Sequence, residues 1–250
     1  MGLFIRDDPQ YSEDVRQTGF NRYKQLLAVR FGQWWKVGII TLLGMVPLIA
    51  GILYSIGVSS VLLLLPFSIM GGLIAGPFLA GLYDAVLRGL RDDPLPWKEA
   101  WIRSWRQNWK ASLVPGSLMG LMAGLYAFMG MLLWWAAEVP PSLGTVALYL
   151  FSLLFLLVIY TLYWPQLVLF RQSPAIRLRN CVLFCVKYFW RTMGAGLIQL
   201  AFVAIYVLFA PWSVLLFPVI GAWYIVFLAQ FLIYDQLDAS LRIESQFVQG

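Results

Sequence analysis

The feature that most limits the fold of this chain is a set of six long apolar stretches, none of which has a charged residue in its central part. A helix that crosses a bilayer needs about 20 predominantly apolar residues, and a water-soluble fold of this size could not bury six such stretches. The composition agrees, because only 12% of the residues are charged whereas soluble domains carry about 25%. We therefore expect an all-α integral membrane bundle of about six transmembrane helices. The stretches are Val37–Gly57, Ser60–Leu87, Ala111–Ala136, Leu143–Tyr163, Thr192–Ala210 and Trp212–Tyr234.

The second stretch is the longest and contains Pro66, Gly76 and Pro77. Proline and glycine weaken a helix, but neighbouring helices can satisfy the freed backbone groups in a membrane. We expect either a kinked span or a short span that runs into a helix leaving the membrane.

All 18 lysines and arginines fall in segments that a six-helix chain places on one side of the membrane. These segments are the N-terminus, the second and fourth connections and the C-terminal tail. Basic residues are retained in the cytoplasm during insertion, so we expect both termini to be cytoplasmic. The predicted organisation is a cytoplasmic segment 1–36, a transmembrane domain 37–234 and a cytoplasmic tail 235–250. In a soluble chain, a net charge of +6 would indicate binding to nucleic acid. Here the location of the basic residues on one side of the membrane accounts for the charge, so we expect no nucleic-acid partner.

The basic segments carry apolar residues at helical spacing. This pattern occurs over residues 20–36, over 96–110 and again over 182–189. Basic amphipathic helices rich in aromatic residues lie in the headgroup layer of a membrane, and we expect three of them on the cytoplasmic leaflet. The second forms a candidate membrane-interface or partner surface, with an aromatic platform for a sugar or a cationic headgroup as the alternative. Its residues are Trp97, Trp101, Trp105 and Trp109, together with Arg103 and Arg106.

Glycines recur every four residues in two of the predicted spans. Such ridges let helix backbones approach closely, and van der Waals packing then holds the helices together in lipid. We expect helix packing, with an oligomer seam or a moving helix as the alternative. The candidates are Gly72 and Gly76 in the second span and Gly116, Gly120 and Gly124 in the third.

Three polar residues within or at the ends of the predicted spans are candidate ligand or ion contacts. Ionisable groups inside a membrane mark transport pathways, and Asp84 follows an apolar run with Arg88 four residues later. An interfacial ion pair between them is the simpler interpretation. Gln199 and Gln230 lie deeper in the predicted spans. Glutamines at such positions form hydrogen bonds between helices more often than they bind a substrate.

The sequence offers little for catalysis. The chain has no histidine, which excludes a histidine-based triad and leaves Cys181 and Cys185 as a poor zinc site. No glycine-rich loop is followed by the Lys–Ser or Lys–Thr pair that binds phosphate. We therefore expect no enzyme activity, no catalytic residue, no cofactor and no metal.

Two neighbouring motifs resemble those of the YesL family of bacterial membrane proteins. The first is Gly76-Pro77-Phe78-Leu79-Ala80-Gly81-Leu82-Tyr83, and the second is Trp101-Ile102-Arg103-Ser104-Trp105-Arg106-Gln107-Asn108-Trp109-Lys110. Here tryptophan replaces the phenylalanines usual in that family, and Asp84 replaces an apolar residue. The resemblance implies a small polytopic protein of the bacterial cytoplasmic membrane that accompanies carbohydrate uptake by ATP-driven transporters, and it supplies no catalytic residues.

Two functions from different classes follow as hypotheses. One is a non-enzymatic accessory protein whose partners are the lipid bilayer and either transporter subunits or further copies of this chain. The other is a small transporter or channel for a neutral or lipid-like substrate.

Overall fold

The computed structural model describes residues 17–210 and 212–247, and every regular element in these ranges is a helix. The prediction of an all-α membrane bundle is confirmed. The helices are α1 (Gly19–Gly57), α2 (Val61–Leu90), α3 (Trp97–Met131), the short π-helix η1 (Leu132–Ala136), α4 (Leu143–Leu169), α5 (Pro174–Lys187), α6 (Phe189–Leu208), α7 (Trp212–Ile220), α8 (Ala222–Leu241) and α9 (Ile243–Phe247).

Five helical segments of the described chain are long and apolar enough to cross a membrane. The sixth predicted span is not one continuous helix, because it is divided into α7 and α8 at Gly221. Pro218 lies inside α7, where it cannot donate a backbone hydrogen bond. The second predicted span is one helix of 30 residues that continues through Pro66 and Pro77.

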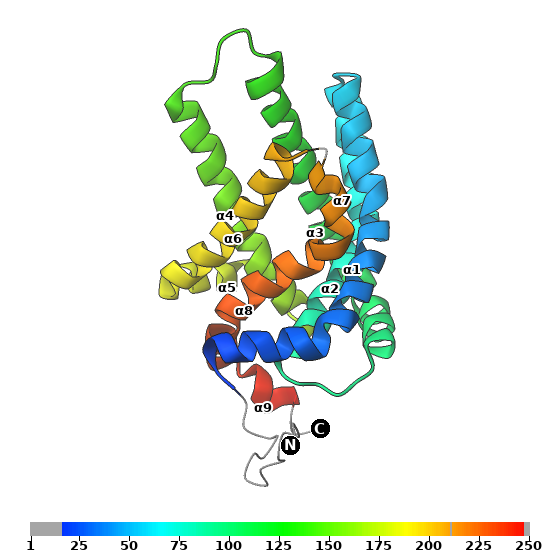
Figure 1. The fold of residues 1–250 in the computed structure, drawn as a ribbon, viewed down its shortest axis with the longest axis vertical. Coiled ribbons are helices and arrows are strands. Elements are labelled where there is room, and N and C mark those ends of the chain that lie inside the picture. Colours follow the sequence, from blue (N-terminus) through cyan, green and yellow to red (C-terminus); the bar gives the residue numbers. More distant parts are fainter. Residues whose placement is uncertain (1–16, 211, 248–250) are drawn as a thin grey trace, which may run out of the picture.

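The predicted amphipathic segments differ in how they join the spans. The first two are continuous with α1 and α3, so α1 crosses the expected domain boundary at residue 37 without a break. The third is the separate helix α5, which a turn at Tyr188 divides from α6. Figure 1 shows the first part of α1 running across the lower end of the bundle before the helix turns upward.

Serine side chains begin three of the helices. Ser60, Ser142 and Ser173 each accept a hydrogen bond from the backbone N–H three residues later. These hydroxyls satisfy amide groups that have no partner in the first turn of a helix. The starts of α2, α4 and α5 are thereby set by local sequence.

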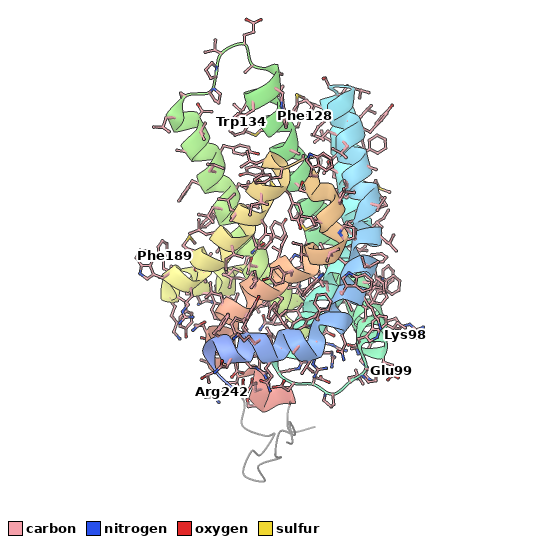
Figure 2. All side chains as sticks on the ribbon, in the orientation of Figure 1. Lys98, Glu99, Phe128, Trp134, Phe189 and Arg242 are labelled. Carbon is pink, nitrogen blue, oxygen red and sulfur yellow. The ribbon has the colours of Figure 1, made fainter. Side chains whose placement is uncertain are left out.

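The two ends of the bundle differ in chemistry. The lower end in Figure 1 carries the start of α1, the α2–α3 connection and α9, whereas the α1–α2 turn and the η1–α4 connection lie at the opposite end. In Figure 2, Lys98, Glu99 and Arg242 lie toward the lower end, while Phe128 and Trp134 lie toward the upper end. We call the lower end the basic end.

Candidate functional site: a cavity at the basic end

A cavity of about 440 Å³ lies where α2, α3 and α4 reach the basic end. Its volume falls in the range of small-molecule sites, which is roughly 300–1,000 Å³. Four arginines line it, against one lining carboxylate, that of Asp84. The lining arginines are Arg88, Arg91, Arg171 and Arg177, and the uncharged polar lining residues are Ser104, Gln107, Asn108 and Gln172.

An ion-pair network forms one wall of the cavity. Arg88 donates from Nε to the Asp84 carboxylate at 2.8 Å and from a terminal nitrogen to Asp93 at 2.6 Å. Arg91 lies 3.4 Å from the same Asp93 carboxylate. Because the side chains of Asp84 and Arg91 are almost fully buried, solvent screens these charges little. The expected pair between Asp84 and Arg88 is therefore present and faces the cavity.

Asp93 anchors this network from the α2–α3 connection. Burial disfavours its charged form, but the backbone N–H of Leu95 and the guanidinium groups of Arg88 and Arg91 outweigh that effect. The pKa of the Asp93 carboxyl consequently lies below its ordinary value.

Arg177 supplies a different kind of charge to the cavity. Its residue is 6% exposed, and its guanidinium carbon lies 5.8 Å from the centre of the Tyr163 ring. Within the described part of the chain the Arg177 side chain has no hydrogen bond or carboxylate partner, and its buried Nε is unsatisfied. Arg171, in the connection before α5, is exposed. Within residues 17–210 and 212–247, Arg171 and Arg177 therefore bring positive charge to the cavity without a carboxylate partner.

Arg22 holds the first part of α1 against this end of the bundle. It donates to the carbonyl oxygen of Leu90 at 3.1 Å and pairs with the Asp92 carboxylate. Trp34 donates from its indole nitrogen to the Ala85 carbonyl, at 3.2 Å. These contacts fix the end of α2, which carries Arg88 and is directly followed by Arg91.

The predicted tryptophan surface is divided between protein and exterior. Trp97, Trp101 and Trp105 are partly buried, whereas Trp109 is exposed. The Trp101 ring packs 5.8 Å from Phe78 and stacks 6.5 Å from Trp105. The two candidate arginines of this surface, Arg103 and Arg106, are exposed. This helix therefore turns part of its aromatic face toward α2 rather than all of it toward lipid.

The glycine candidates lie where α2 packs against α3. A side chain added at Gly116 would lie 2.7 Å from the Cα of Gly76, and one added at Gly120 would lie 2.7 Å from the Cα of Gly72. Real Cβ atoms do not approach backbone this closely, so these positions require glycine. Gly124 differs because its nearest neighbour is the Ser68 side chain.

The two glutamine candidates converge on one residue of α4. Gln230, from α8, is fully buried and donates to the Thr161 carbonyl oxygen at 2.9 Å. Gln199, from α6, donates to the Thr161 hydroxyl. Both glutamines therefore form contacts that join α4, α6 and α8. Neither lines the cavity, where Asp84 lies.

Arg171 and Arg177 were not distinguished from the other basic residues by sequence alone. A signal for Arg177 exists in the spacing of α5, since Arg177, Cys181, Phe184 and Cys185 are its buried residues and lie on one face. Burial raises the pKa of the Cys181 thiol to about 12, so this cysteine is a neutral packing residue at physiological pH.

Nothing in the described residues groups three side chains of the kind that hold a metal ion. Comparison of the chain with models of protein families, with curated proteins and with solved structures finds no match.

Proposed function

We propose that this chain is a non-enzymatic accessory protein of the bacterial cytoplasmic membrane, with both termini cytoplasmic, that serves carbohydrate uptake by ATP-driven transporters. The observation that supports this role best is the position of the polar cavity, which lies at the basic end. A cavity there is accessible from one side of the membrane and suits contact with a ligand or partner on that side. The motif resemblance to the YesL family supplies the link to carbohydrate uptake.

The polar groups deeper in the bundle support an accessory role over transport. Gln199 and Gln230 both donate to Thr161, so their donors are engaged between helices. In lipid such bonds contribute to helix association. A pathway that used the N–H donors of these amides for a substrate would first have to break contacts that join three helices.

The orientation is tested by labelling two engineered cysteines in a chain with Cys181 and Cys185 replaced by alanine. Lys98→Cys reports the basic end and Glu138→Cys the opposite end, and both positions are exposed. A membrane-impermeant maleimide added to intact spheroplasts should label Glu138→Cys, and Lys98→Cys only after permeabilisation. The reverse pattern would overturn the orientation.

The role is tested by combining uptake in cells with flux through the purified chain. Deletion of the gene should lower sugar uptake by intact cells, while the purified chain in liposomes should move no sugar alone. Unchanged uptake after deletion, with every transporter expressed, would reject the accessory role.

A small transporter for a neutral or lipid-like substrate is the second candidate, and the break between α7 and α8 favours it. Discontinuous helices form substrate sites in many transporters, and this break follows Pro218 and lies at Gly221. Substrate flux in liposomes containing only this chain would establish the second candidate over the first.

A further inference from the structure

We propose that the cavity at the basic end is a binding site for the phosphate group of a polyol phosphate ester, held by Arg177 and Arg171 beside Arg88 and Arg91. Binding by the purified chain does not require the accessory role, so the two proposals fail independently.

The charge of the cavity is the first reason. Its lining contains four arginines and Asp84, and the nearby Asp93 contributes a second carboxylate by pairing with Arg88 and Arg91. Among the described residues, both carboxylates are engaged by Arg88 and Arg91, which leaves the charges of Arg171 and Arg177 without a carboxylate. Burying cations without counter-charge is costly, and an anion in the cavity would remove that cost.

The state of Arg177 is the second reason. Its residue is 6% exposed and lines the cavity, its side chain makes no hydrogen bond within residues 17–210 and 212–247, and its Nε is buried. A buried polar group without a partner is destabilising. The cation–π contact with the Tyr163 ring satisfies none of the guanidinium N–H donors, and the terminal N–H groups remain available to a ligand oxygen.

The position of Arg177 in α5 is the third reason. Pro174 begins this helix, and no acidic residue lies in its first turn. The N-terminus of a helix carries partial positive charge, which favours anions and disfavours an arginine there. Arg177 therefore adds positive charge to an already positive helix end, an arrangement that an anion stabilises.

The shape and remaining lining identify the class of ligand. Arginine binds phosphate through paired N–H groups, and several arginines suit a group with more than one charged oxygen. A volume of about 440 Å³ exceeds that of one phosphate group. Ser104, Gln107 and Asn108 line the cavity from α3 and suit the hydroxyls of a polyol. Such an ester is available either as a phospholipid headgroup or as a soluble metabolite.

Titration calorimetry on the full chain in a neutral detergent tests the site. The probes are glycerol 3-phosphate for the soluble source and dihexanoyl phosphatidylglycerol for the lipid source. The control for the first is glycerol, which lacks the phosphate, and the control for the second is dihexanoyl phosphatidylcholine, in which a choline cation neutralises the phosphodiester and replaces the polyol. We expect one phosphate probe to bind more tightly than its control. Which one binds identifies the source.

Three variants test whether the measured binding takes place in the cavity. Arg177→Gln and Arg171→Gln should each weaken binding about ten-fold, which corresponds to one charge-assisted hydrogen bond. Arg179→Gln is the matched control, because Arg179 is exposed on the same helix and does not line the cavity; its binding should stay unchanged. Since Arg171 is exposed, its variant remains informative even where Arg177→Gln folds poorly. Absence of binding by both phosphate probes, or equal weakening by all three variants, would overturn the proposal.

Discussion

Arg88 bridges two carboxylates at the end of α2, donating to Asp84 at 2.8 Å and to Asp93 at 2.6 Å. The side chain of Asp84 is 5% exposed, whereas that of Asp92, which pairs with Arg22, is 51% exposed. The two carboxylates therefore lie in very different surroundings, and their contributions to the free energy of unfolding should differ.

Asp84→Asn should destabilise the chain by about 3 kcal/mol, because removing one partner of a buried pair leaves an uncompensated charge. The effect stays at the low end of that class since Arg88 keeps Asp93. Asp92→Asn is the comparison and should cost less, because the Asp92 carboxylate is half exposed and Arg22 keeps its hydrogen bond to the Leu90 carbonyl oxygen. Unfolding in detergent, followed by circular dichroism, measures both. Equal losses would contradict the burial difference.

Gly116→Ala should destabilise the bundle by about 3 kcal/mol, the upper part of the overpacking range. The added Cβ would meet the backbone of Gly76 at 2.7 Å, and the backbone of α2 cannot rotate away as a side chain can. Gly32→Ala is the matched control: nothing lies within 4 Å of its added methyl group, and alanine favours a helix by about 0.5–1 kcal/mol. Thermal unfolding of the two variants should shift in opposite directions, and a parallel shift would argue against close contact between α2 and α3.

The hydrogen bonds at Thr161 predict a specific pattern of coupling. Gln199 donates to the Thr161 hydroxyl but Gln230 donates to its backbone carbonyl, and only the hydroxyl is lost in Thr161→Val. The losses in unfolding free energy from Thr161→Val and Gln199→Leu should therefore be non-additive by about 0.6–1.7 kcal/mol. Those from Thr161→Val and Gln230→Leu should couple less strongly, because valine keeps the carbonyl oxygen to which Gln230 donates.

A double-mutant cycle for each pair measures this difference. Coupling of Thr161 with Gln230 but not with Gln199 would show that the hydrogen-bond partners are assigned wrongly.

Acid should weaken the α2–α3 connection through Asp93. Its pKa lies below the ordinary value in the folded chain, so its contribution to stability is present above the unfolded pKa of about 3.9. The contribution is lost as the pH falls through the folded pKa. Asp93→Asn should remove this part of the acid dependence, so the difference in stability between the two chains should shrink below about pH 4. Melting temperatures between pH 3 and pH 7 measure it, and a constant difference over that range would contradict it.

The sequence predicted the helical bundle because apolar length alone determines which segments can lie in lipid. It predicted the pair of Asp84 with Arg88 because residues four apart share a helix face. It did not predict the break at Gly221, since apolar character runs through Trp212–Tyr234 without interruption and the break is a backbone event near Pro218.

The cavity could not be predicted from local sequence patterns, for a different reason. Arg88 belongs to α2, Arg91 directly follows its last residue, Arg171 lies in the connection after α4 and Arg177 belongs to α5. Only the packing of α2, α3, α4 and α5 brings them together, and spacing along the chain carries no information about that arrangement. The burial of Arg177 could have been suspected from its register with Cys181, but not the cavity it faces.

The claim that this end of the bundle binds a phosphate ester is tested most directly by density in the cavity. The measurement is an electron microscopy structure of the full chain in nanodiscs containing phosphatidylglycerol, with glycerol 3-phosphate added. We expect density for a phosphate group within hydrogen-bond distance of Arg177 and Arg171. An empty cavity, with the Arg177 guanidinium paired to a carboxylate of the chain itself, would contradict the claim.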